Sequence, residues 1–211
     1  MKWIHEYKAF IGVLLLTFSF NGYANQIKRT ILDIDQEILY QEFNLENKIS
    51  RTVFKKSIEK HNQSKSKKHD ILTIIDFGQP SSIKRLVVLD LKNNKVLFNE
   101  YVSHGAKSGG LFAKSFSNID GSHQSSLGQY LTENTYYGKH GYSLVLDGKE
   151  KTNSKAKSRY IVFHGAEYSS QSFLDKHGYL GRSHGCPSVD KKVSKKIINV
   201  IKEGSYIYAY K

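Results

Sequence analysis

The 211-residue sequence predicts a mainly β domain with a few helices, preceded by a short helical extension. From residue 71 onward, short runs rich in Val, Ile, Leu and Phe are separated by turn residues, which is typical of strands. Between residues 26 and 62, apolar residues recur every three to four positions without proline, which indicates amphipathic helices. Hydrophobic residues make up 39% of the chain, including 14 Tyr and 11 Phe, and this content supports a globular core.

The N-terminus has the pattern of an export signal. A charged start precedes an almost unbroken apolar run over residues 9–20, and Gly22 and Ala24 stand at the spacing that a signal peptidase recognises. The run is shorter than the ~20 residues of a membrane-spanning helix. We therefore expect a signal peptide over residues 1–24 and an exported protein of the periplasm or cell envelope, with no stable membrane anchor after cleavage.

Residues 25–70 are expected to form a helical N-terminal extension and a linker. The isoleucine spacing predicts two short helices with a break near residues 44–47. The Ser- and Lys-rich segment at residues 64–69 indicates a polar, basic linker. The strand-rich domain is then expected over residues 71–211.

The strands of this domain are predicted from β-branched and aromatic runs. Asn93-Asn94 is a suitable tight turn between the second and third runs, and it predicts a hairpin. No internal repeat and no parallel βαβ alternation is evident. The expected strands cover residues 71–77, 85–91, 95–102, 142–146, 159–163 and 206–210.

A helix is expected near the C-terminus. One helical stripe, which would face the core, is formed by Val193, Ile197, Ile198 and Ile201. Asp190 is a suitable N-cap, and Gly204 is a suitable stop.

The chain is strongly basic, with a formal net charge of +13. Such a charge suits a polyanionic partner, and for an exported protein the cell envelope is a better candidate than nucleic acid. A solvated basic surface without a dedicated partner is the alternative. No zinc-finger, helix-turn-helix or RNP-like pattern occurs, so no nucleic-acid partner is expected.

The only cysteine, Cys186, stands in a glycine-rich segment over residues 181–188. A thiol becomes a nucleophile when a base takes its proton, and nearby glycines let backbone N–H groups approach a developing oxyanion. Exported proteins usually use cysteines in disulfide pairs, so a retained single thiol favours a chemical role. The alternative is a small buried residue in a turn.

A His-Gly pair, His164-Gly165, precedes Cys186 by 22 positions and follows the expected strand over residues 159–163. A strand end is a rigid position from which the imidazole can be aimed at the thiol. The loop over residues 166–179 would then form part of a substrate wall, or it is a surface excursion without function.

The His-Gly pair, a variable loop and then Ser183-His184-Gly185-Cys186 resemble the signature of L,D-transpeptidase (YkuD-like) catalytic domains, which act on bacterial peptidoglycan. The resemblance covers about residues 71–211. Further segments are similar to the branch called the murein L,D-transpeptidase catalytic domain family, namely Ile74-Ile75-Asp76-Phe77, Lys84-Arg85-Leu86, Ser125-Ser126-Leu127-Gly128 and residues 137–144.

This resemblance implies a cysteine acyltransferase. Cys186 would attack the carbonyl of the third residue of a donor stem tetrapeptide and expel the terminal D-alanine. His164 would be the base, the carbonyl of Gly165 would orient it, and amides near Gly185 and Cys186 would form the oxyanion hole. An amine of a neighbouring stem would give a 3-3 cross-link, whereas water would give L,D-carboxypeptidase trimming. Carbapenems are expected to acylate the same thiol.

Other residues are weaker candidates for the site. Ser183 and His184 match the signature and would support catalysis or contact substrate. Many family members place an apolar residue and then Arg or Asn after the cysteine, whereas Pro187 and Ser188 follow here, which leaves the acyl acceptor and the donor-carboxylate contact open. Arg182 would serve as a carboxylate clamp or form a surface ion pair, and His140 would line the cleft or belong to a turn. His104 is expected in a turn or the core, with the cleft as the alternative, and His123 and His177 are expected in loops.

Two other kinds of function compete with acyl transfer. His164, His184 and Cys186 are legitimate zinc ligands, but no His-Glu-x-x-His or paired-cysteine spacing is present, so neither a metal nor another cofactor is expected. The second alternative is a non-catalytic peptidoglycan-binding envelope module. The expected partners are peptidoglycan stem peptides, with an envelope protein as a further candidate acceptor.

Overall fold

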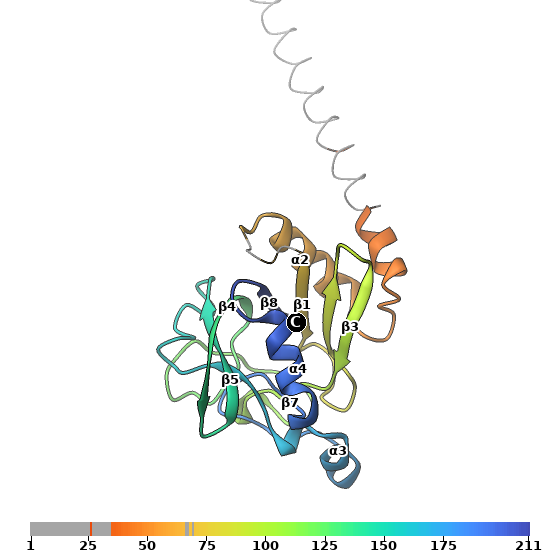
Figure 1. Ribbon diagram of the computed structural model, residues 1–211. Coiled ribbons are helices and arrows are strands. Elements are labelled where there is room, and N and C mark those ends of the chain that lie inside the picture. The colour runs from red at the N-terminus through yellow and green to blue at the C-terminus, as the bar shows by residue number, and fades with distance from the viewer. Residues whose placement is uncertain (1–25, 27–34, 66–67, 69) are drawn as a thin grey trace, which may run out of the picture. The chain divides into compact units, whose positions relative to one another are not determined.

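The computed structural model describes most of the chain after the predicted signal peptide (Figure 1). The segment predicted to be a signal peptide, residues 1–24, lies outside the described residues. Within the described part of the chain, no helix is long and apolar enough to cross a membrane. The described residues are 26, 35–65, 68 and 70–211.

The chain divides into two compact units, residues 1–42 and residues 43–211. In the first unit, residues 35–42 are helical. In the second, α2 (Arg51–Asn62) follows a segment in which Asn44 and Asn47 have φ values of 48° and 62°. The left-handed conformation suits asparagine, and it breaks the helical path where the sequence predicted a break.

The second unit begins well before the expected domain start at residue 71. Val53, Phe54 and Ile58 of α2 are buried. The helix contacts strands β1 and β8, so it is packed as part of this unit. A division at residue 70 therefore separates helical from strand-rich sequence within one compact unit.

The second unit contains an eight-stranded mixed sheet with the order β3-β2-β1-β8-β4-β5-β6-β7. Only β1 with β8 and β6 with β7 pair in parallel, and the other neighbours are antiparallel. The mainly β class predicted from the sequence is therefore confirmed. The strands are β1 (Ile71–Asp76), β2 (Leu86–Asp90), β3 (Lys95–Glu100), β4 (Gly128–Gly138), β5 (Gly141–Gly148), β6 (Val162–Gly165), β7 (Ser188–Val189) and β8 (Tyr206–Tyr210).

Two single-residue bridges connect the segment after β3 to the segment around β7. Ser103 pairs with Ser188, and Gly105 pairs with Ser183. Strands β3 and β7 are the two ends of the strand order, and the bridges connect the segment that follows β3 with the segment around β7. The loop that carries Cys186 is therefore fixed on two sides.

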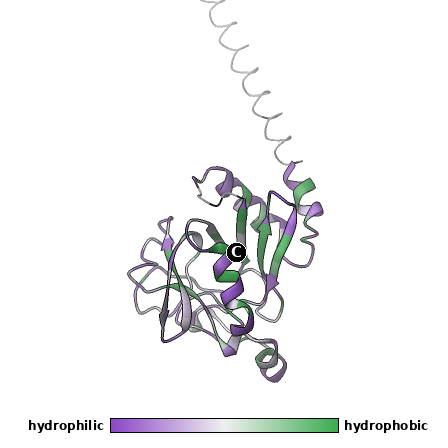
Figure 2. Cartoon of the chain, viewed as in Figure 1, coloured by the Kyte–Doolittle hydropathy of each residue, from purple (hydrophilic) through white to green (hydrophobic). Residues whose placement is uncertain are grey.

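Helix α4 (Lys191–Ile201) begins as the sequence predicts, because the Asp190 side chain accepts a hydrogen bond from the Lys192 N–H over 2.9 Å. Ile197, Ile198 and Ile201 are fully buried in the hydrophobic core. Figure 2 shows hydrophilic and hydrophobic residues alternating along the helix. The buried stripe holds α4 against β6, the strand that carries His164.

The hairpin of β2 and β3 and the strand β8 lie where the sequence predicts them, with Asn94 at φ 50° in the hairpin turn. The expected strand over residues 159–163 is wrong in its bounds, because residues 159 and 160 belong to a turn and β6 starts at Val162. Strand β4 was not predicted, since its sequence is polar and contains Gly and Asn that indicate turns. The helical turn α3 (Gln171–His177) lies within the loop expected over residues 166–179.

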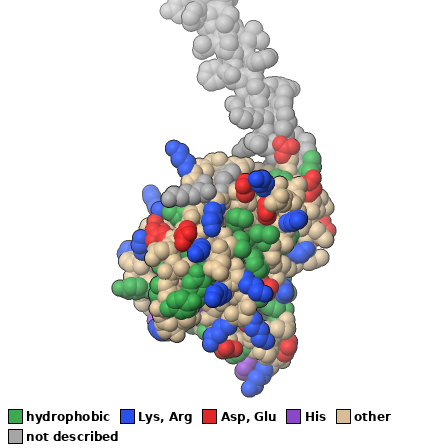
Figure 3. Space-filling model, viewed as in Figure 1, with side chains coloured by type: hydrophobic (Ala, Val, Ile, Leu, Met, Phe, Trp, Pro, Cys, Tyr) green, Lys and Arg blue, Asp and Glu red, His purple; other side chains and the backbone are tan. Residues whose placement is uncertain are grey.

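The basic residues are spread over the face of the molecule that Figure 3 shows. Acidic side chains lie among them on the same face. Several lysines form ion pairs with partly exposed carboxylates, such as Lys157 with Glu133 at 2.8 Å. This distribution is typical of a solvated surface.

Candidate active site

Cys186 lies two residues before β7, beside the start of β6. The parallel register pairs His164 with Ser188, so Val162 stands opposite Cys186. The Val162 N–H donates to Sγ over 3.4 Å, and the thiol lies 3.7 Å from the carbonyl oxygen of Tyr160. The thiol is partly buried and is held against the start of a strand.

His164 lies in β6 between Ser143 of β5 and Ser188 of β7, and only 1% of its surface is exposed. Its Nδ1 is 3.0 Å from the carbonyl oxygen of Gly165. Because a carbonyl can only accept, Nδ1 carries the proton, and Nε2 of the neutral ring is left as an acceptor. Burial lowers the pKa of His164 to about 4, so the ring is neutral at physiological pH.

Gly165 is required by the packing behind His164. A Cβ at this position would lie 2.5 Å from Oγ of Ser194 in α4. The glycine therefore lets α4 approach β6 closely, and its carbonyl remains aimed at the imidazole. This contact explains the glycine of the His-Gly pair in physical terms.

One cleft of about 390 Å³ contains Cys186 and His164. It brings together most of the residues that the sequence singled out, although Gly165 and Gly185 do not line it. The remaining lining comes from β4, from the turn between β4 and β5, from the turn before β6 and the first residue of β6, and from the loop after β6. The expected residues in its lining are Cys186, His164, His184, Ser183, Arg182 and His140, and the others are Tyr136, Lys139, Arg159, Tyr160, Ile161, Val162 and Tyr168.

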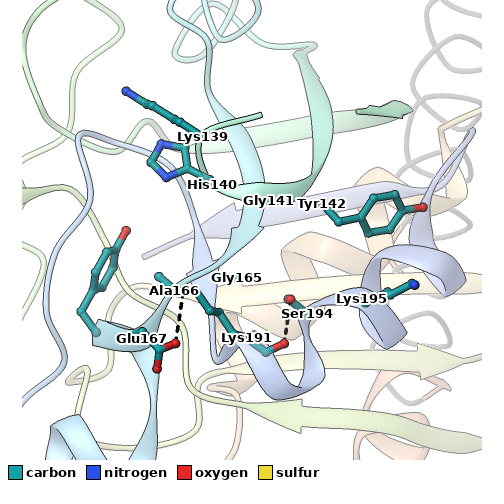
Figure 4. A pocket seen from close by; sticks show the side chains of 11 residues that line it. Lys139, His140, Gly141, Tyr142, Gly165, Ala166, Glu167, Lys191, Ser194 and Lys195 are labelled. Carbon is teal, nitrogen blue, oxygen red and sulfur yellow. Dashed lines mark hydrogen bonds and ion pairs between the residues drawn. The ribbon is translucent and has the colours of Figure 1, made fainter. Parts of the chain in front are cut away.

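A second cavity of about 510 Å³ adjoins this cleft (Figure 4). His140 and Tyr168 line both spaces. In Figure 4, His140 lies on one side of the cavity and Glu167 and Lys191 on the other, where these two form an ion pair at 3.1 Å. Space for a ligand therefore extends along both sides of His140.

Ser183 and Gly185 shape the loop that carries the thiol. Ser183 Oγ donates to the Cys186 carbonyl over 2.6 Å and accepts from the Gly185 N–H over 3.0 Å. Gly185 has φ 123°, and a Cβ there would lie 2.8 Å from the Gln124 carbonyl oxygen. Because the Gly185 N–H is already used within the loop, the Cys186 N–H is the better candidate donor for an oxyanion.

Four histidine rings form two stacks around the cleft. His140 stacks on His164 with ring centroids 4.3 Å apart, and His123 stacks on His184 at 4.1 Å with an angle of 1°. Partial burial lowers the pKa of His140, and Lys139 adds to this effect. Within the described residues, no three His, Cys, Asp or Glu side chains are grouped so that they could hold a metal ion. His123 was expected only in a loop, and no local pattern indicates its stack with His184.

Two arginines line the cleft in different ways. Arg182 is exposed, and it donates to the Gly109 carbonyl over 3.3 Å and lies 5.3 Å from the Tyr179 ring centroid. Among the described residues it has no carboxylate within 4.0 Å, so its charge is available to a ligand. Arg159, which the sequence placed in a strand, is instead buried and donates to the carbonyls of Ser117 and Gln124 over 2.7 and 2.8 Å.

His104 lies outside the cleft, in the core as expected. Its Nδ1 accepts from Arg85 over 2.8 Å, and its Nε2 faces the Gly109 carbonyl at 3.2 Å. Burial lowers the pKa of His104 to about 4. Its own carbonyl accepts from the Ser183 N–H over 3.0 Å, so it supports the nucleophile loop from behind.

Tyr168 is the residue by which the loop over residues 166–179 reaches the cleft. The Ser188 hydroxyl donates to its phenol oxygen over 3.2 Å. Burial raises the pKa of Tyr168, so the phenol stays neutral. One residue of the loop therefore contributes to the wall of the site, while α3 does not line it.

The reactivity of the thiol should depend on pH in a defined direction. Burial raises the pKa of the Cys186 thiol, while the Val162 amide and the charge of Arg159 partly oppose that effect. With the His164 pKa lowered to about 4, the resting pair is a neutral thiol and a neutral imidazole. We expect the rate at which iodoacetamide alkylates Cys186, measured by intact mass, to increase with pH. The rate should keep increasing above the ordinary thiol pKa of about 8.5. A rate that is already constant below about pH 7 would instead indicate a resting thiolate–imidazolium pair.

Comparison with protein families and solved structures gives a match over most of the chain. A family model described as the L,D-transpeptidase catalytic domain matches residues 45–210. A comparison with curated protein sequences finds no match.

Three of the solved structures to which this chain is similar each match 67% of it. An L,D-transpeptidase from Mycobacterium smegmatis is 12% identical with a TM-score of 0.42, and 59% of that chain is covered. L,D-transpeptidase 1 from Mycobacterium tuberculosis is 11% identical with a TM-score of 0.39, and 62% of it is covered. The helical cell shape determining protein Pgp2 from Campylobacter jejuni is 14% identical with a TM-score of 0.41, and 47% of it is covered. The chain thus spans about half to three fifths of the length of these proteins.

Proposed function

Because the chain belongs to the L,D-transpeptidase catalytic domain family, we propose that it is a peptidoglycan L,D-transpeptidase with Cys186 as its nucleophile. The observation that carries this proposal is the cleft that holds the thiol of Cys186 together with the imidazole of His164. The hydrogen bond from His164 Nδ1 to the Gly165 carbonyl leaves Nε2 free to accept a proton. A neutral base in the same cleft as a neutral thiol is suited to general-base activation of that thiol.

The proposed first half-reaction forms a thioacyl-enzyme. His164 Nε2 takes the thiol proton while Sγ attacks the carbonyl carbon of the third residue of a donor stem tetrapeptide. The Cys186 N–H stabilises the negative oxygen of the tetrahedral intermediate. The bond to the terminal D-alanine then breaks, and the imidazolium returns its proton to the departing amine.

The second half-reaction releases the acyl group. An amine of a neighbouring stem loses a proton to His164 and attacks the thioester, the C–S bond breaks, and the thiol regains its proton. The product is a 3-3 cross-link between stems. Water in place of the amine gives a shortened stem, which is the L,D-carboxypeptidase reaction, and an amine of an envelope protein gives a protein attached to the wall.

Other residues of the cleft are proposed to bind and position the substrate. Arg182 carries an available guanidinium that suits a donor carboxylate. Ser183 holds the nucleophile loop in shape, and His184 and His140 line the cleft together with Cys186 and His164. The proposed location is the periplasm or cell envelope, which fits this substrate and the export signal that the sequence predicts.

The products of the purified protein distinguish these activities. Incubation with disaccharide tetrapeptides followed by mass spectrometry should give dimers that have lost one D-alanine. Shortened monomers alone would indicate trimming, and exchange of the terminal residue would indicate D-amino-acid transfer. Unchanged substrate from folded, reduced protein would favour the non-catalytic wall-binding module.

Carbapenem labelling provides an independent prediction. A carbapenem contains a strained amide that a thiolate can open, so we expect one covalent adduct per chain on the peptide that contains Cys186. The adduct should be absent in Cys186→Ala, slower to form in His164→Ala and unaffected by a metal chelator. Because Cys186 is the only thiol, intact mass assigns the adduct without ambiguity. Labelling that survives in Cys186→Ala would place the reactive group elsewhere.

A further inference from the structure

Tyr160 occupies a backbone position that normally favours glycine. The Ile161 N–H bonds to the Ala156 carbonyl over 2.9 Å, and the Tyr160 N–H bonds to the Lys157 carbonyl over 3.1 Å. This pair of bonds is a Schellman motif, in which the residue at the position of Tyr160 is left-handed and usually glycine. Tyr160 has φ 54°, so a bulky side chain is held in a strained conformation.

The strain is not offset by burial of the ring. Tyr160 is 84% exposed. Its carbonyl oxygen lies 3.7 Å from the Cys186 sulfur, and the residue lines the cleft. Neither backbone preference nor core packing therefore explains a tyrosine here, whereas a ligand at the cleft would.

A second tyrosine lines the same cleft from β4. Tyr136 is 41% exposed, and its ring lies against the backbone of Gly138, where a Cβ would be 2.7 Å from the ring. The ring is thus supported by backbone while part of it stays open to solvent. Lys139 and Arg182 in the same lining make a purely apolar ligand unfavourable.

We propose that Tyr160 and Tyr136 form a stacking subsite for a pyranose ring of the glycan strand that carries the stem peptide. This proposal rests on the proposed function, since it concerns the substrate of the same cleft. A pyranose has a flat face of C–H groups, which the electron-rich face of an aromatic ring attracts, and its hydroxyls can bond to the phenols. Binding energy from this non-reacting part of the substrate would favour glycan-linked stems over free peptides.

Tyr137 supplies a matched control. It neighbours Tyr136 in β4 and is 74% exposed, but it packs against Tyr142 at a centroid distance of 5.2 Å and does not line the cleft. Tyr137→Ala removes an exposed aromatic ring of the same strand without touching the proposed subsite. Its substrate preference should equal that of the wild type.

The test compares kcat/KM for D-alanine release from a disaccharide tetrapeptide and from the free tetrapeptide. In Tyr160→Gly, the ratio of these two values should fall by about two- to tenfold, the usual range for one aromatic contact. Its melting temperature should stay close to that of the wild type, because relief of the left-handed strain offsets the added freedom of the unfolded chain. Tyr160→Trp should keep the preference, and Tyr136→Ala should lower it.

If the ratio of the two kcat/KM values is unchanged in Tyr160→Gly, the proposal is overturned. This includes the case in which both values fall by the same factor. If the wild type turns over neither substrate, the proposed function fails, and the subsite is tested separately by titrating the Cys186→Ala protein with the disaccharide tetrapeptide in a calorimeter. Weaker binding in Cys186→Ala/Tyr160→Gly than in Cys186→Ala alone supports the subsite. Equal binding by the two proteins contradicts it.

Discussion

Cys186→Ala is expected to abolish turnover of stem tetrapeptides, because the substitution removes the attacking atom. The loss of one sulfur at a partly buried position changes little volume, and the loop keeps its Ser183 and Gly185 hydrogen bonds. The variant should therefore remain folded. D-alanine release measures turnover, and circular dichroism checks the fold.

Cys186→Ser is the conservative control for this prediction. A hydroxyl is far less acidic than a thiol, so the serine variant should be nearly as inactive although it restores an atom at the position of the sulfur. A rate close to that of the wild type in either variant would mean that another group carries out the attack.

His164→Ala should lower the rate of acylation by about 10²- to 10⁴-fold, the usual contribution of a general base. KM should change less than kcat, because the imidazole acts on the proton of the thiol and not on a distant part of the substrate. The measurement is single-turnover formation of the thioacyl-enzyme over a range of pH. At high pH, where the thiol ionises without assistance, the difference between variant and wild type should narrow.

His184→Ala is the matched control for the base. His184 also lines the cleft, but it is exposed and stacks on His123. Among the residues that the structure describes, it has no carbonyl contact of the kind that fixes the His164 tautomer. Its replacement should therefore cost less than that of His164. The opposite order of effects would exchange the roles of the two histidines.

The sequence predicted those helices and strands whose position is marked by a short local pattern of apolar, turn and cap residues. The hairpin around Asn94 and the helix after Asp190 combine a hydrophobic period with a suitable turn or cap residue, and both lie where the sequence predicted them. Strand β4 has a polar, tyrosine-rich sequence without such a pattern. It is paired with β5 and β8, and these tertiary contacts are not visible in its own sequence. The start of β6 was misplaced for a related reason, since the preceding turn has Tyr160 where a glycine would have indicated its end.

The candidate active site also combines features with a local sequence pattern and features that depend on contacts between distant segments. The motifs around His164 and Cys186 are local, and the sequence pointed to a common site that the parallel register of β6 and β7 places together. The stack of His123 on His184 and the anchoring of Arg159 to Ser117 and Gln124 join distant segments. Such contacts depend on tertiary packing, and a single sequence gives no signal for them.

The most direct measurement of the central proposal is the intact mass of the protein after brief mixing with a disaccharide tetrapeptide that lacks an acceptor amine. We expect a transient adduct equal to the substrate minus D-alanine, located on the peptide with Cys186 and removed by hydroxylamine, as a thioester is. The same experiment with Cys186→Ala should give no adduct. Release of D-alanine by the wild type and by Cys186→Ala at equal rates, without any adduct on the chain, would contradict covalent catalysis by this cysteine.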